Sequence, residues 1–175
     1  MQWIDRARAM LHAMNGGLSL PDPDRIDVGS VPDTALLIKA IDAAMPHSAV
    51  LHLIGPRHKT LLPFLATRSI AVRRSVGEYW VSLDNGAVGE LARVVAGCPS
   101  NEICAHIFVQ DVEHTLVEAF GRDRGEDVVW LSRRVPKASF CRFLEVIGGS
   151  AQVSQLRPAR RIVRQSGPAR VLSLR

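Results

Sequence analysis

Short apolar runs alternate along this chain with stretches in which hydrophobic residues recur every three or four positions. The clearest apolar run is 49–54, which ends at a glycine, and 103–109 and 127–131 repeat the pattern. Runs of this length, bounded by turn residues, are typical of buried strands. Residues 69–83 alternate between hydrophobic and polar positions and are rich in β-formers, which predicts a pair of strands.

Helical spacing precedes or follows most of these runs. It predicts helices at 2–15, 33–45, 60–66, 88–95, 112–120 and 136–147. Asp33 and Asp111 are suited to cap two of them, and Pro136 is suited to a first helical turn. Residues 16–32 contain three prolines and three aspartates and are predicted to form a loop.

The order of predicted elements is helix and strand, a strand pair, and then further helix–strand units. Alternation of this kind favours an α/β sandwich with a central mixed, partly parallel sheet of about four to five strands and helices on its faces. We therefore expect one α/β domain over 1–149, which includes the helix 2–15 and the loop 16–32. A basic C-terminal extension follows over 150–175.

Composition supports a single globular domain. The chain has 175 residues, of which 47% are hydrophobic and 22% are charged. No apolar run is long enough to cross a bilayer, and the N-terminal stretch is interrupted by charges, so a soluble cytoplasmic protein is expected. The three cysteines include no C-x-x-C pair, which argues against a disulfide framework and a zinc knuckle.

The loops after the predicted strands carry most of the candidate chemistry. In a parallel sheet these loops meet at one edge, where cations and helix N-termini favour an anion. Such an anion site, suited to a phosphate-like ligand, would combine Arg57, His58, Lys59, Asp111, His114, Arg133 and Arg134. The loop at 55–60 lacks the spacing of a P-loop, so no cofactor is identified.

Histidines and carboxylates give weaker signals. His52 and His106 fall inside predicted strands, and with Asp111 and His114 they offer nitrogen and oxygen ligands for a metal. A core imidazole bonded to a backbone carbonyl explains His52 more simply, so no metal site is predicted. No G-x-S-x-G elbow or other nucleophilic constellation is present, and the sequence leaves open whether the protein is an enzyme.

Charge is concentrated in the C-terminal segment. The net charge is +5, yet residues 146–175 hold six arginines and no acid, so the rest of the chain is close to neutral. A segment of this kind attracts acidic surfaces or phosphates. Its candidate contact residues are Arg157, Arg160, Arg161, Arg164 and Arg170.

These observations favour a non-enzymatic binding or protein-interaction module that uses its basic C-terminal segment. The expected partner is a protein, including a second copy of the chain in a homo-oligomer. The alternative is a small-molecule enzyme or receptor that holds an anionic ligand at the carboxyl ends of the strands. Nucleic acid ranks third, because the C-terminal segment has no aromatic residue to stack on bases.

Overall fold

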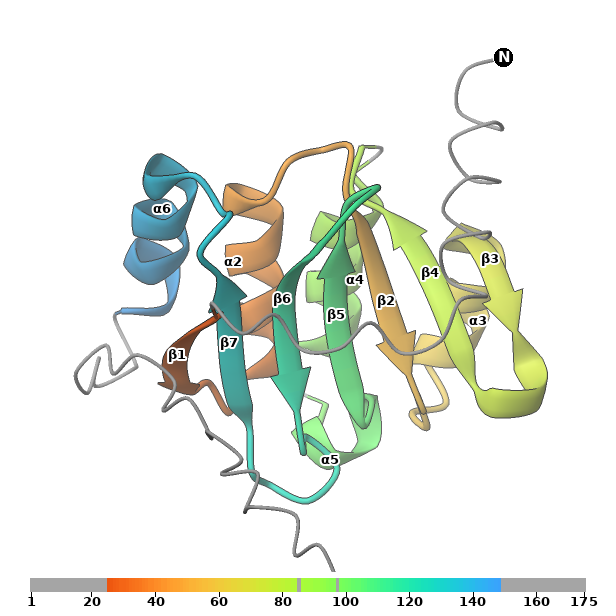
Figure 1. The fold of residues 1–175 in the computed structure, drawn as a ribbon. Coiled ribbons are helices and arrows are strands. Elements are labelled where there is room, and N and C mark those ends of the chain that lie inside the picture. Colours follow the sequence, from red (N-terminus) through yellow and green to blue (C-terminus); the bar gives the residue numbers. More distant parts are fainter. Residues whose placement is uncertain (1–24, 85, 97, 149–175) are drawn as a thin grey trace, which may run out of the picture.

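The computed structural model describes residues 25–84, 86–96 and 98–148. Seven strands form one sheet (Figure 1): β1 (Arg25–Ser30), β2 (Val50–Ile54), β3 (Ser69–Arg73), β4 (Glu78–Ser82), β5 (His106–Gln110), β6 (Thr115–Phe120) and β7 (Val128–Ser132). The helices are α2 (Thr34–Ala44), α3 (Leu61–Arg68), α4 (Ala87–Val95), α5 (Ser100–Ile103) and α6 (Lys137–Ile147), with a 3₁₀ turn, η1 (Arg74–Val76). None of the described helices is long and apolar enough to span a membrane.

The strand order is β1-β7-β6-β5-β2-β4-β3, and every neighbouring pair is antiparallel. The prediction of a mixed, partly parallel sheet of four to five strands is therefore wrong, although the chain does combine helices with one sheet. Two unrecognised strands, β1 and β6, account for the difference. With β6 present, β5, β6 and β7 form a simple antiparallel meander instead of two parallel strands joined by a helix.

Strand β6 occupies most of the segment predicted as a helix at 112–120. Its apolar residues fit both the helical period of 3.6 and the strand period of two. In the strand, Val117 and Ala119 face one side, and Glu118 and Phe120 face the other. The predicted helix cap, Asp111, instead closes the β5–β6 turn. Its carboxylate accepts hydrogen bonds from the backbone N–H groups of residues 113 and 114, at 2.8 and 2.6 Å.

Strand β1 lies within the segment predicted as a loop at 16–32. Its Asp27 carboxylate accepts a hydrogen bond from the N–H of Gly29, and the pairing with β7 is irregular between these two residues. Gly29 has φ +90°, which only glycine adopts readily. An irregular edge strand of this kind resembles a loop in sequence. The predicted helix 2–15 and the extension 150–175 lie outside the described residues.

The remaining predicted elements are confirmed. The apolar runs at 49–54 and 127–131 correspond to β2 and β7, and the strand pair at 69–83 corresponds to β3 and β4. The helices predicted at 33–45, 60–66, 88–95 and 136–147 correspond to α2, α3, α4 and α6. The run 103–109 contains the end of α5 and most of β5.

The main hydrophobic core lies between the helices and one face of the sheet. Alternate residues of the central strands, including Leu51, Leu53, Ile107 and Val109, are fully buried there against α2, α4 and α6. Figure 1 shows α2 and α4 behind the sheet and α6 beside its β1–β7 edge, with the opposite face toward the viewer. Within the described residues no helix covers that opposite face.

A buried guanidinium joins the β6–β7 loop to the start of α2. Arg122 has no solvent exposure, and it donates hydrogen bonds to the Thr34 hydroxyl (2.6 Å) and to the carbonyls of Val31 (3.0 Å) and Pro32 (3.1 Å). The Asp127 carboxylate lies 3.8 Å from the guanidinium. Burial lowers the pKa of Arg122 and Asp127 raises it, and an arginine stays charged in such a setting.

We predict that Arg122→Ala lowers the free energy of unfolding by about 3 kcal/mol, because it leaves two carbonyls and a hydroxyl without their buried donor and the Asp127 carboxylate without its paired cation. Urea unfolding measures the change. Arg124→Ala, in the same loop but exposed, is the matched control and should change stability by less than about 0.5 kcal/mol. Equal losses in the two variants would contradict the role assigned to Arg122.

Candidate functional site

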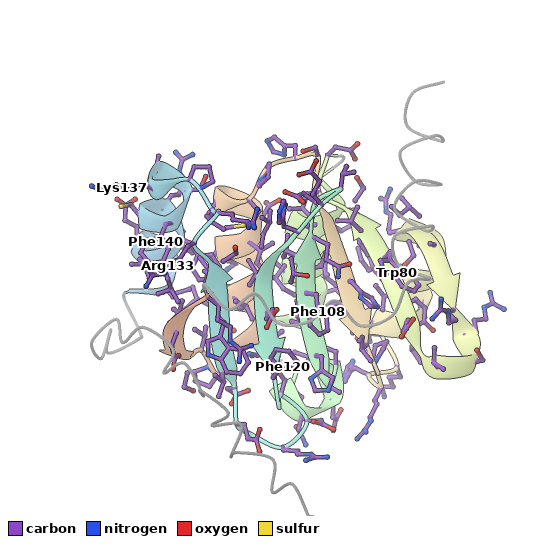
Figure 2. All side chains as sticks on the ribbon, in the orientation of Figure 1. Trp80, Phe108, Phe120, Arg133, Lys137 and Phe140 are labelled. Carbon is purple, nitrogen blue, oxygen red and sulfur yellow. The ribbon has the colours of Figure 1, made fainter. Side chains whose placement is uncertain are left out.

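One face of the sheet is covered by none of the described helices, and we call it the helix-free face. A row of large side chains runs across its strands. Cross-strand pairing places Trp80 of β4 beside His52 of β2, and His52 beside Phe108 of β5. Phe108 is paired with Glu118 of β6, which in turn is paired with Trp130 of β7. Because paired residues point to the same face, five strands contribute to one continuous surface. Figure 2 shows Trp80, Phe108 and Phe120 on it.

Ring contacts run through this surface without a gap. The rings of His52 and Trp80 are stacked, with centroids 4.4 Å apart and planes 13° from parallel. His52 and Phe108 are 5.8 Å apart, Phe108 and Phe120 are 5.3 Å apart, and Phe120 and Trp130 are 5.1 Å apart. These are ordinary distances for interacting aromatic rings. We call these five residues the aromatic row.

An arginine lies over each end of the aromatic row. The Arg25 guanidinium is 3.9 Å from the centre of the Trp130 ring, and the Arg73 guanidinium is 5.9 Å from that of Trp80. Both arginines are paired with carboxylates: Arg25 with Glu118 at 2.9 Å and Arg73 with Glu78 at 3.2 Å. The charges at both ends are therefore balanced, and the surface between them is apolar and aromatic.

Two polar ring atoms in the aromatic row are enclosed. His52 Nε2 and Trp80 Nε1 have no contact with solvent and no hydrogen-bond partner among the described residues. Burial, with a smaller effect from Arg73, lowers the pKa of His52 to about 4. The imidazole is therefore neutral at physiological pH and contributes as a flat, weakly polar ring.

The predicted anion-site residues lie at opposite ends of the sheet. Because β2 and β5 are antiparallel, the end of β2 lies beside the start of β5. The loop that carries Arg57, His58 and Lys59 is therefore at one end, and Asp111 and His114 are at the other. The single site predicted from parallel strands is not assembled.

At each end of the sheet, some residues of the predicted anion site remain close together. At the end of β7, the Arg134 side chain contacts the His114 ring, and Asp111 is 3.7 Å from that ring. Arg133 is exposed on the same loop. At the other end, Arg57 pairs with Asp123 at 3.7 Å. The arginine-rich positions 157–170 lie outside the described residues.

His58 lies within a small group of polar side chains. Its Nδ1 is 2.7 Å from the Thr60 hydroxyl and 3.6 Å from Cys98 Sγ, and its Nε2 is 3.7 Å from a Glu102 oxygen. The half-buried Cys98 thiol therefore lies against an imidazole and also contacts the Val94 carbonyl at 3.5 Å.

In the part of the chain that the structure describes, no three His, Cys, Asp or Glu side chains converge as metal ligands do. His52 and His106 belong to the helix-free face, where His106 packs edge-on against Phe120 with centroids 5.3 Å apart. His52 was interpreted as a core imidazole bonded to a carbonyl, but it lies outside the aliphatic core, its ring stacks on Trp80, and its Nε2 has no hydrogen-bond partner among the described residues.

Comparison with family models, with curated proteins and with solved structures finds no match to this chain.

The aromatic row was not predicted from the sequence. Its members lie on five strands, so their proximity depends on strand order and register. A partial signal was present: His52 sits between Leu51 and Leu53, and Phe108 sits between two apolar residues. Period-two alternation places such residues on the face opposite the aliphatic core.

We predict that the protein loses stability as the pH falls from about 6.5 to about 4. The folded state holds the pKa of His52 near 4, so the unfolded state binds more protons in this window and is favoured by acid. The loss attributable to His52 is about 2 kcal/mol after allowance for partial exposure. Urea unfolding at several pH values measures it.

His52→Phe should remove this part of the pH dependence while keeping a ring against Trp80. The exposed His47→Gln variant, which retains His52, should keep the wild-type dependence. Identical pH profiles for wild type and His52→Phe would show that His52 is not the titrating group.

We predict that iodoacetamide labels the exposed Cys141 and the half-buried Cys98 well before Cys104. Burial raises the pKa of Cys104 to about 12 and removes it from solvent. Rates would be read by mass spectrometry, and labelling of Cys104 as fast as Cys141 would contradict this order.

Proposed function

We propose that this protein is a non-enzymatic binding module whose binding surface is the helix-free face of its sheet. The observation that carries the proposal is the aromatic row, a neutral and largely apolar surface that crosses five strands. Large aromatic side chains are enriched where proteins bind one another. His52 also lacks the near-neutral pKa of a typical general acid or base.

An amphipathic helix of a protein partner is the occupant that this surface favours. A sheet packs its apolar faces against further layers, and α2, α4 and α6 supply a layer on only one face. The paired carboxylates and arginines at the two ends leave no large net charge for a strongly charged ligand. A helix with one apolar stripe satisfies both conditions.

Single-stranded nucleic acid fits this surface less well. Base stacking needs a free ring face, but the Trp80 ring lies between His52 and the Arg73 guanidinium. Phosphates need available cations, whereas Arg25 and Arg73 are paired with carboxylates. A protein partner is therefore the better candidate.

The basic segment 150–175 remains a proposed second contact for that partner, through long-range attraction to an acidic surface. The alternative function, an anionic small molecule at the strand ends, has less support. Its candidate residues are divided between two ends of the sheet, and at each end they are partly engaged with neighbouring side chains.

A photoreactive residue in the aromatic row tests the proposal. We would replace Phe108 with benzoylphenylalanine in the full chain, irradiate cells that express it, and identify the cross-linked peptide by mass spectrometry. The expected product is a protein segment with hydrophobic residues at helical spacing. The control carries the same residue at Phe140 of α6, on the opposite side of the sheet (Figure 2).

Three results would contradict the proposal: cross-links to nucleic acid, no cross-link at position 108, or the same products from positions 108 and 140. A helical segment captured only from position 108 would support it, whether that segment belongs to another protein or to this chain.

A further inference from the structure

The exposed hydrophobic side chains of the described residues are concentrated at one edge of the sheet. Five large ones are between 37% and 54% exposed: Leu62, Ile70, Val72, Val76 and Val112. Ile70 and Val72 belong to β3, and Val76 belongs to the turn η1 that follows it directly. Leu62 belongs to α3, which contacts β3. Exposed apolar residues that gather in one place mark interaction surfaces, whereas scattered ones need no explanation.

Strand β3 is also an edge strand. Among the described residues it is paired only with β4, where Ala71 lies opposite Trp80 and Val72 lies opposite Tyr79. Figure 1 shows no described helix or strand beyond β3 at this edge. The outer side of an edge strand presents backbone N–H and C=O groups, and a further strand is the structure that matches them best.

The other edge strand, β1, is protected in ways that β3 is not. Asp27 lies in the middle of β1 and binds the N–H of Gly29, and the pairing with β7 is irregular between these two residues. Charged side chains and irregularities of this kind prevent further strands from pairing. In β3 the irregularity is confined to residues 69–71, and the single charged residue, Arg73, is the last one. The edge of β3 is therefore the more suitable of the two for an added strand.

The charges around β3 favour a different partner over a second copy of this chain. Arg68 and Arg74 flank the strand. Arg68 pairs with a glutamate at 2.9 Å, whereas none of the ion pairs among the described residues involves Arg74. Two copies of β3 paired antiparallel about Ala71 would align their apolar residues, but they would also place Arg68 of each copy opposite Arg74 of the other. Like charges directly opposite are destabilising, so the chemistry favours a segment that brings a carboxylate to Arg74.

We propose that the outer edge of β3 is a further binding surface, which adds an extended segment of a protein partner to the sheet. The added strand runs antiparallel to β3, as every neighbouring pair in this sheet does, so its N-terminal end lies beside Arg74. Its apolar residues cover Ile70 and Val72, and an acidic residue at its N-terminal end pairs with Arg74. Backbone hydrogen bonds supply affinity in such complexes, and side-chain contacts select the segment. This proposal does not depend on the helix-free face.

A synthetic peptide tests the proposal on the full chain. The peptide is capped at both ends and consists of two aspartates followed by alternating valine and threonine. Amide NMR of the isotope-labelled protein reports where the peptide binds. We expect saturable shifts of the β3 backbone amides at millimolar peptide, with the amides of β1, the other edge strand, unchanged. No shift in β3, or equal shifts in the two edge strands, would overturn the proposal.

N-methylation of the peptide distinguishes strand addition from other modes of binding. A strand directs alternate N–H groups to opposite edges, so methyl groups on alternate amides block only one edge. Two peptides methylated in opposite phases should therefore differ: one should lose binding, and the other should keep it. Binding by both, or by neither, would show that the peptide is not added as a strand.

Arg74→Glu tests the charge contact. It should weaken binding of the aspartate peptide by about three-fold, and it should favour a peptide with lysines in place of the aspartates. The control, Arg124→Glu, makes the same change of charge at an exposed position in the β6–β7 loop and should leave the affinity unchanged. Equal losses in the two variants would remove the proposed contact with Arg74.

Light scattering tests the second copy directly. The proposal expects the same molar mass for the wild-type chain and for Val72→Asp. A wild-type dimer that Val72→Asp converts to a monomer would overturn the proposal, because the edge of β3 would then hold another copy of the chain. The cross-linking result at position 108 bears only on the helix-free face, so the two proposals can fail separately.

Discussion

Antiparallel pairing of all seven strands determines where the candidate functional residues of this chain lie. It sends the ends of successive strands to opposite edges, so the cations after β2 and the His114 region after β5 cannot share a ligand. The same pairing aligns alternate residues of five strands on one face. The consequence is a surface assembled across the sheet instead of a pocket at its edge.

The two faces of the sheet differ in chemistry. The face against α2, α4 and α6 is aliphatic and closely packed, and the buried Arg122 fixes the β6–β7 loop to the start of α2. The other face carries rings, a neutral imidazole and two arginine–carboxylate pairs. Partly exposed ion pairs such as these contribute little to stability compared with aliphatic packing, and enclosed ring nitrogens without partners cost free energy. We propose that recognition of a partner, and not stability alone, accounts for their presence on this face.

The sequence predicted the elements better than their arrangement. Strong local signals identified β2, β4, β7, α2 and α6 correctly, since each has one clear period and recognisable ends. Residues 115–120 fit a helix and a strand equally, and Asp111 can cap a helix or close a hairpin turn, so local information could not decide between them. The predicted site was divided by a separate feature, because β2 is antiparallel to β5 and therefore ends at the opposite edge of the sheet. The aromatic row could not be predicted from local sequence either, because His52, Phe108 and Trp130 become neighbours only through strand order.

The account depends most on the claim that the helix-free face of the sheet binds a helix of a protein partner. Cross-linking from benzoylphenylalanine at position 108 of the full chain tests this claim most directly. The account predicts that a protein segment with hydrophobic residues at helical spacing is captured from position 108 in β5 and not from position 140 in α6. No cross-link at position 108, or the same products from both positions, would contradict it.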